Sequence, residues 1–165
     1  MVYFKYQKRK RYTDMDYETV ELKEKLVAAL CARTSNASPE MTKVIGGLWQ
    51  KFYTPGCYDR IPNRTNEKAL GIYTDYADKE KGDYTAAVGC EVKEKGATPE
   101  EIEIITIPAG KYAKFIVKGN MVTAVNDFWQ QLWGMNLNRS FVCDFEEYQN
   151  ADPENAEIHI YIGIK

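Results

Sequence analysis

The alternation of apolar and polar residues is clearest in the last segment of the chain. In Glu157–Ile164 every second residue is isoleucine, and the residues between them are His159, Tyr161 and Gly163. Side chains of a strand point alternately to its two faces, so this period predicts a strand with one aliphatic and one half-polar face. We expect the isoleucine face to pack on helices and the His/Tyr face to be free for a ligand cleft.

Two segments instead carry apolar residues at helical spacing, and each has an apolar stripe. The first is predicted to begin at Ser38-Pro39-Glu40, with Ser38 as N-cap, and to end at Pro55-Gly56. The second is predicted to follow Gly119-Asn120. The stripes consist of Met41, Val44, Ile45, Leu48, Trp49 and Phe52 in the first helix, and Met121, Ala124, Val125, Phe128, Leu132 and Trp133 in the second.

The remaining apolar segments are predicted to be strands, and a polar lead-in of residues 1–16 precedes them. Residues 21–33 are ambiguous, because Leu and Ala favour a helix whereas the length of the apolar centre favours a buried strand. We assign a strand there because the repeat described next requires one. The other predicted strands are 69–76, 84–92, 101–107, 111–117, 141–148 and 157–164.

The second half of the chain repeats the first. Residues 72–76 and 84–92 align with residues 144–148 and 156–164 at a shift of 72, and the aromatic helix segments align at a shift of 80. This predicts an α+β fold: two strand–helix–strand–strand units with pseudo-twofold symmetry, an antiparallel sheet and two main helices. The expected domain is 17–165, with halves of about 17–95 and 99–165. In this alignment Thr74 of the first half becomes Glu146 in the second.

Composition narrows the classes of function. The net charge of −2 provides no general basic field for nucleic acid, although residues 5–11 (KYQKRKR) are locally basic. The four cysteines are dispersed and there is one histidine, so we expect no metal site, no disulfide framework and no cofactor. No secretion signal or membrane-length apolar run is visible, and we expect a cytoplasmic protein without a membrane partner.

Glu146 is the first candidate for chemistry. It lies on a predicted strand rich in aromatic residues, and a carboxylate among aromatic rings suits an organic cation through ion pairing and cation–π attraction. The alternative is a solvated acid on an edge strand. His159 and Tyr161 form a second candidate, as a general base and a proton donor, and the alternative is a hydrogen-bonded packing histidine.

Several segments resemble the GyrI-like small-molecule-binding domain, which is also the effector-binding domain of AraC- and MerR-type bacterial regulators. They are residues 107–115 (IPAGKYAKF), Phe145-Glu146-Glu147-Tyr148 and the strands around them, with residues 48–52 and 71–73 of the first half. The resemblance covers about residues 20–165. It implies an aromatic cleft between the two units, with an acid on the penultimate strand that meets positively charged ligands.

Carried over residue by residue, the resemblance makes Glu146 the counter-ion. The resemblance also places Tyr112 and Tyr161 in the cleft, and we expect Trp49, Tyr76 and Trp129 to complete its walls. Nothing before residue 20 resembles a helix-turn-helix, so we expect a stand-alone module that senses or sequesters aromatic or amphiphilic cations and does not bind specific DNA. Two alternatives stay open: a hydrolase of strained electrophilic rings that uses Glu146 with Tyr112 or Tyr161, and a protein-interaction module of the gyrase-inhibitor type.

Overall fold

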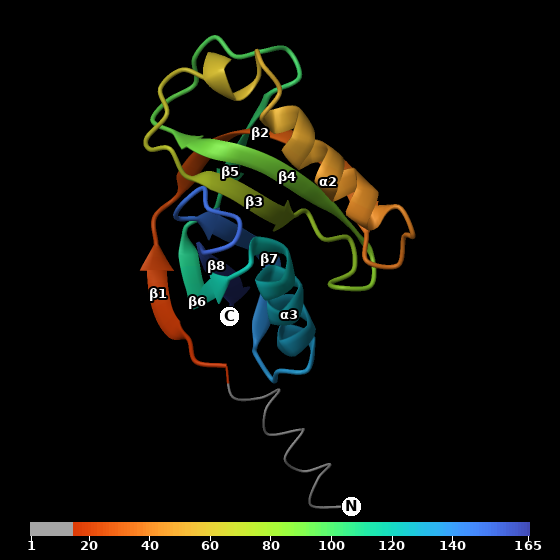
Figure 1. Cartoon of the computed structure of the whole chain (residues 1–165). Helices are drawn as coiled ribbons and strands as arrows, with labels where there is room; N and C mark the ends of the chain where they lie inside the picture. Colours follow the sequence, from red (N-terminus) through yellow and green to blue (C-terminus); the bar gives the residue numbers. More distant parts are fainter. Residues whose placement is uncertain (1–14) are drawn as a thin grey trace, which may run out of the picture.

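The computed structural model describes residues 15–165, which form one eight-stranded sheet and two α-helices (Figure 1). The basic residues 5–11 lie outside the described part of the chain. Among the described residues, no helix is long and apolar enough to cross a membrane. In chain order the elements are β1 (Glu18–Leu22), β2 (Lys25–Ser35), α2 (Met41–Phe52), η1 (Tyr58–Arg60), β3 (Ala69–Thr74), β4 (Asp83–Val92), β5 (Glu103–Ile107), β6 (Gly110–Gly119), α3 (Met121–Trp133), β7 (Arg139–Tyr148) and β8 (Ala156–Ile164).

The sheet confirms the predicted α+β duplication. Its order is β1-β6-β8-β7-β3-β4-β2-β5, and every pairing is antiparallel. The first unit is β2-α2-β3-β4 and the second is β6-α3-β7-β8. Without the outer strands β1 and β5, each half of the sheet has the same order from its edge inward, β2-β4-β3 in the first unit and β6-β8-β7 in the second. The two units meet where β3 pairs with β7.

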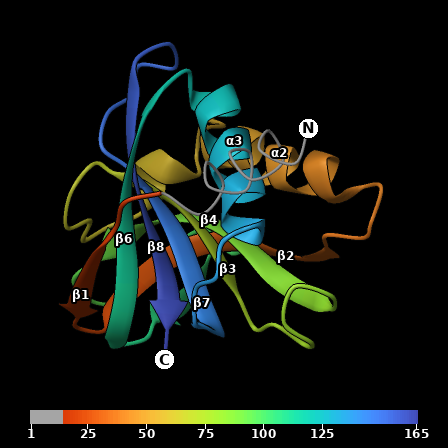
Figure 2. The ribbon, with the colours of Figure 1, turned by 90° about the horizontal axis from the view of Figure 1, so that it is seen from below.

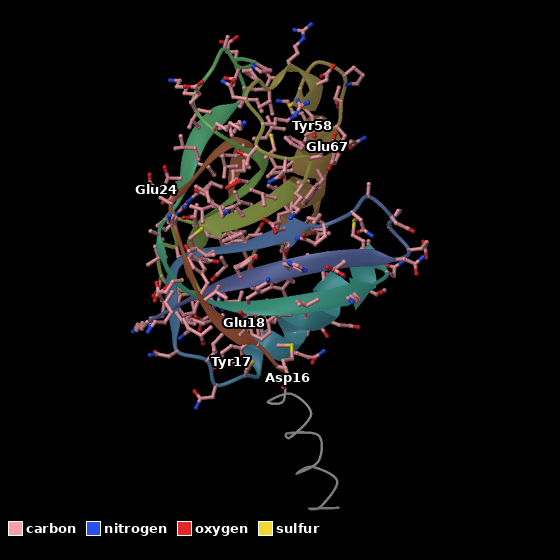
Figure 3. The ribbon with its side chains drawn as sticks, turned by 90° about the vertical axis from the view of Figure 1, so that its left-hand side faces the viewer. Asp16, Tyr17, Glu18, Glu24, Tyr58 and Glu67 are labelled. Atoms are coloured by element: carbon pink, nitrogen blue, oxygen red, sulfur yellow. The ribbon has the colours of Figure 1, made fainter. Side chains whose placement is uncertain are left out.

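Short connections show that the sheet is strongly curled. β1 and β2 are six places apart in the sheet order, which would be roughly 29 Å in a flat sheet. Only Lys23 and Glu24 join them, and so short a link reaches about 10 Å. Pro108 and Ala109 join β5 to β6 in the same way. Glu24 accordingly lies between the two halves, whereas Glu18 lies on the α3 half and Tyr58 on the α2 half (Figure 3).

The curled sheet has hydrophobic clusters under the helices on one face and a separate cluster on its helix-free face. Both helices lie on the same side of the strands (Figure 2). Beneath α2 are residues such as Leu30 and Val88, and beneath α3 are Ile158, Ile160 and Ile162. The helix-free face forms its own cluster, on which side chains of both outer strands, β1 and β5, pack. The prediction that the isoleucine face of the last strand packs on a helix is therefore confirmed.

The register of β3 and β7 corrects the sequence repeat. Thr74 pairs with Cys143 and faces the helix-free side, so it does not occupy the place of Glu146. Gly71 pairs with Glu146, and Val88 and Ile160 are the partners of these two residues on the next strands. Val88 and Ile160 are equivalent at the shift of 72, whereas Gly71 and Glu146 are 75 residues apart. The difference arises because the segment from Gly71 to Val88 is three residues longer than the segment from Glu146 to Ile160. A slip by an odd number of residues exchanges the two faces of a strand, and this is why the shift of 72 misplaced Thr74.

Candidate functional site

A cleft of about 390 Å³ lies between α2 and α3 above the junction of the two units. From α2 it is lined by Met41, Thr42, Ile45, Gly46 and Trp49, and from α3 by Val122, Val125, Asn126, Trp129, Gln130 and Trp133. The strands and loops below contribute Asn36, Tyr73, Tyr76, Glu80, Tyr84, Arg139, Glu146 and Tyr148. The lining is mainly aromatic and aliphatic with a few polar groups, as in most small-molecule sites.

Glu146 is held at the centre of this cleft and is only 1% exposed. Its Oε2 accepts hydrogen bonds from the Trp129 indole N–H at 2.8 Å and the Tyr73 hydroxyl at 3.1 Å. Its Oε1 accepts a hydrogen bond from the Tyr148 hydroxyl at 2.8 Å. Three donors from three elements therefore fix the carboxylate, which is consistent with a buried, specifically placed acid rather than a solvated one.

Gly71 makes room for this acid. It is the cross-strand partner of Glu146, and a Cβ at its position would lie 3.0 Å from Glu146 Oε1 and 3.3 Å from Trp49 Cζ2. Directly opposed residues in an antiparallel pair share a face and come close together. The absence of a side chain at residue 71 is thus a steric condition for the position of the carboxylate.

The aromatic groups around Glu146 follow the pseudo-twofold symmetry. Tyr73 and Tyr148 are 75 residues apart, the same interval as Gly71 and Glu146, and both hydroxyls donate to Glu146. Trp129 packs edge-on against Tyr73 at 5.4 Å, and Trp49 does so against Tyr148 at 5.0 Å. The pseudo-twofold axis therefore passes between Gly71 and Glu146, so the acid lies at the centre of the symmetric arrangement.

Burial controls the ionisation of the central groups. Desolvation raises the pKa of Glu146 above its ordinary value, and the three hydrogen bonds from Trp129, Tyr148 and Tyr73 oppose this effect only in part. Desolvation, together with the nearby Glu146 carboxylate, also raises the pKa of Tyr73 and of Tyr148. Both tyrosines are therefore hydrogen-bond donors at neutral pH.

A second buried carboxylate, Asp144, lies beside the cleft. Its Oδ2 accepts hydrogen bonds from the Tyr76 hydroxyl at 2.6 Å and from Arg139 Nη2 at 2.7 Å, and its Oδ1 accepts one from the Gly163 backbone N–H at 3.0 Å. Arg139 and Tyr76 line the cleft, so Asp144 positions part of its wall. Among residues 15–165, no cluster of three or more His, Cys, Asp or Glu side chains could hold a metal ion.

Four of the six predicted ligand residues come together in this cleft: Trp49, Tyr76, Trp129 and Glu146. Tyr112 and Tyr161 do not. The Tyr112 hydroxyl donates to the Pro108 carbonyl at 2.7 Å, and Tyr161 stacks on Phe145, so both belong to the cluster on the helix-free face. Their assignment to the cleft walls was wrong because helices and cleft share the isoleucine face of the last strand, and the curled sheet encloses the other face.

The histidine candidate is also remote from the cleft. His159 Nε2 lies 2.9 Å from Glu157 Oε2, and the residue is not among those lining the cleft. The sequence reasoning missed Gly71, Tyr73 and Arg139 as part of the site. The signal for Tyr73 was present, because aligning Gly71-Ile72-Tyr73 with Glu146-Glu147-Tyr148 superimposes the two tyrosines.

Comparisons with known proteins agree with this fold. The family model described as Cass2, integron-associated effector binding protein, matches residues 18–164. The crystal structure of the integron cassette protein VCH_CASS2 of Vibrio cholerae is 26% identical, with a TM-score of 0.73 over 90% of this chain and 95% of that one. The structure of SAV2435 bound to tetraphenylphosphonium is 19% identical, with a TM-score of 0.74 over 92% of this chain and 94% of that one, and shows the same fold.

A regulator is also similar in sequence. The transcriptional regulator BrlR of Pseudomonas aeruginosa is 29% identical over 130 residues, which are 73% of this chain. The chain spans about half the length of this relative, since the match covers 46% of BrlR.

Proposed function

The chain belongs to the Cass2 family of integron-associated effector binding proteins, and we propose that its effector is a lipophilic organic cation bound between α2 and α3. Glu146 acts as the counter-ion, and the rings of Trp49, Tyr73, Trp129 and Tyr148 form the inner walls. The role that follows is the sensing or sequestration of such compounds.

The single observation that carries this proposal is the buried carboxylate in an aromatic cleft. A carboxylate that is 1% exposed and surrounded by rings has lost most of its hydration. A cation that enters the cleft restores charge compensation, and the faces of the aromatic rings attract it further. A neutral ligand of the same shape gains only the apolar contacts.

A relative supports the same class of ligand. The structure of SAV2435 contains tetraphenylphosphonium, a lipophilic cation without hydrogen-bond donors. The cleft described here has the aromatic lining that such a cation requires. Within residues 15–165 its central acid is held by neutral donors alone, so its charge is left for the ligand to compensate.

The hydrolase alternative receives less support from the geometry. General-base catalysis needs a carboxylate with a free lone pair for a water molecule, and three protein donors leave Glu146 only about one of its four acceptor sites. The predicted proton donors, Tyr112 and Tyr161, lie on the other face of the sheet. Binding therefore describes the arrangement better than turnover.

Titration with tetraphenylphosphonium, followed by tryptophan fluorescence, tests the proposal. We expect micromolar binding to the unaltered protein and a loss of about 1–3 kcal/mol in Glu146→Gln, roughly ten- to hundredfold in Kd. The matched control is Glu147→Gln, because Glu147 is the next residue of β7 and its side chain does not line the cleft. Neutral triphenylphosphine oxide should bind Glu146→Gln and Glu147→Gln with the same affinity. If Glu146→Gln lost affinity equally for the phosphonium and for the neutral oxide, charge recognition by Glu146 would be ruled out.

A further inference from the structure

Glu146 and Arg139, two of the charged residues that line the cleft, differ in how many of their hydrogen bonds are already made. Glu146 accepts from three protein donors, one on Oε1 and two on Oε2. Arg139 presents a fork of N–H donors, yet among residues 15–165 only its Nη2 has a hydrogen-bond acceptor, Asp144. Its Nε is buried and has no partner in that range. Glu146 therefore has about one of its four acceptor sites left, whereas the guanidinium of Arg139 has several N–H donors to spare.

Arg139 is also fixed in place. Its guanidinium lies over the Phe141 ring at 4.2 Å from the centroid and is paired with Asp144 at 2.7 Å. Its side chain is 11% exposed, and it lines the cleft together with Tyr76. A donor held this rigidly loses little conformational entropy when it forms a hydrogen bond, which favours recognition over loose contact.

We propose that Arg139 is a specificity-determining residue that donates a hydrogen bond to a neutral oxygen acceptor of the ligand. The inference rests on the proposed function and narrows it. The preferred ligand is an organic cation without N–H donors at its charged end and with a ketone, ester or ether oxygen elsewhere. The charged end needs no N–H groups because three of the roughly four acceptor sites of Glu146 are already occupied. The ligand oxygen supplies the acceptor that the free N–H donors of Arg139 lack.

A negatively charged group is the less suitable occupant of this position. Asp144 already compensates the charge of Arg139, and Glu146 lines the same cleft. A carboxylate on the ligand would therefore add a like charge to those of Asp144, Glu146 and Glu80, which also lines the cleft. A neutral acceptor gains the hydrogen bond without that repulsion.

Two matched probes test the inference. The first is (4-benzoylbenzyl)trimethylammonium, and the second is (4-benzylbenzyl)trimethylammonium, in which a methylene replaces the ketone. Both carry a quaternary charge without N–H groups. We expect the ketone to bind the unaltered protein about tenfold more tightly, the effect of one hydrogen bond to a charged donor.

Variants then assign that preference to a residue. In Arg139→Met the ketone and the methylene probe should bind equally, whereas Glu146→Gln should weaken both by the same factor. Gln130→Met is the matched control, because Gln130 is another donor-bearing residue of the cleft. Equal binding of the two probes to the unaltered protein would overturn the inference. A preference that disappears in Gln130→Met but persists in Arg139→Met would do the same.

Photochemistry gives a readout that needs no variant, in case Arg139→Met does not fold. An irradiated benzophenone ketone bonds covalently to C–H groups beside it, so the modified peptide locates the oxygen. We expect adducts at Tyr76 or at Phe141, which contact the Asp144–Arg139 pair. Adducts confined to α2 would contradict the inference. If neither probe bound at all, the proposed function itself would be wrong. Equal binding of the two probes, in contrast, would refute only the role of Arg139.

Discussion

The raised pKa of Glu146 couples ligand binding to protons. Burial raises the pKa of this carboxyl in the empty cleft, and a bound cation favours the carboxylate and lowers it. Cation binding should therefore release protons, and affinity should fall as the pH drops through the raised pKa. Calorimetry in buffers of different ionisation enthalpy measures this release. Heats that are independent of the buffer across the titration of the acid would contradict the prediction, and Glu146→Gln should show no buffer dependence from this site.

Gly71 is the second residue with a measurable consequence. In Gly71→Ala the new Cβ would meet Glu146 Oε1 at 3.0 Å and Trp49 Cζ2 at 3.3 Å, so the carboxylate or the indole must move. We expect a loss of about 1–3 kcal/mol in the free energy of unfolding, together with weaker binding of cations. Urea unfolding and phosphonium titration check the two effects.

A second glycine provides the control for this substitution. A Cβ added at Gly47 in α2 would meet no atom within 4 Å, so Gly47→Ala should stabilise the protein by up to about 1 kcal/mol through helix propensity. If Gly71→Ala and Gly47→Ala changed the free energy of unfolding equally, the space opposite Glu146 would not be sterically restricted.

At this scale the sequence predicted part of the site. Glu146 was identifiable because an acid within an aromatic strand is unusual, and Trp49 and Trp129 because they occupy matching positions in the two aromatic helix segments. Tyr112 and Tyr161 were misplaced, since alternation separates the two faces of a strand but does not say which face the helices cover. Arg139 could not be predicted, because the register of β7 and β8 shifts between Arg139 and Asp144.

Among the secondary-structure elements, the two helices begin differently. The Asn120 side chain accepts from the backbone N–H groups of Val122 and Thr123, whereas Glu40 at the start of α2 makes no side-chain cap. Asn120→Ala should therefore cost about 1 kcal/mol and Glu40→Ala much less. Thermal unfolding of the two variants compares them, and equal losses would contradict the assignment of Asn120 as the stronger cap.

The element boundaries show where sequence patterns were sufficient. The strand assignment of residues 21–33 was confirmed in substance by β2, although this segment also contains the end of a separate strand, β1. β1 was not predicted because its five residues are mostly exposed and carry little apolar alternation. The predicted N-cap of the first helix, Ser38, was two residues early, because the observed N-cap is Glu40. Ser38 instead accepts from the backbone N–H of Glu40 in a turn before α2.

The molecule as a whole should unfold as one unit. The β3–β7 pairing joins the two halves, and the ligand cleft spans this junction, with walls from both helices. A cation bound there stabilises both halves together, by about 2.7 kcal/mol at a free concentration a hundred times Kd. Circular dichroism and tryptophan fluorescence should report one shared transition that moves upward with tetraphenylphosphonium. Two separate transitions, of which only one responds to the ligand, would contradict this view.

The place of Glu146 on the pseudo-twofold axis has a consequence for how such a cleft can arise. In a dimer of identical subunits, any residue on the axis occurs twice. Two glycines would leave the centre without charge, and two glutamates would set carboxylates against each other in a space that already restricts a single Cβ. One acid opposite one empty position requires two halves that differ in sequence. Two halves that are covalently joined in one chain meet this requirement, because each half can keep a different residue at the centre of symmetry.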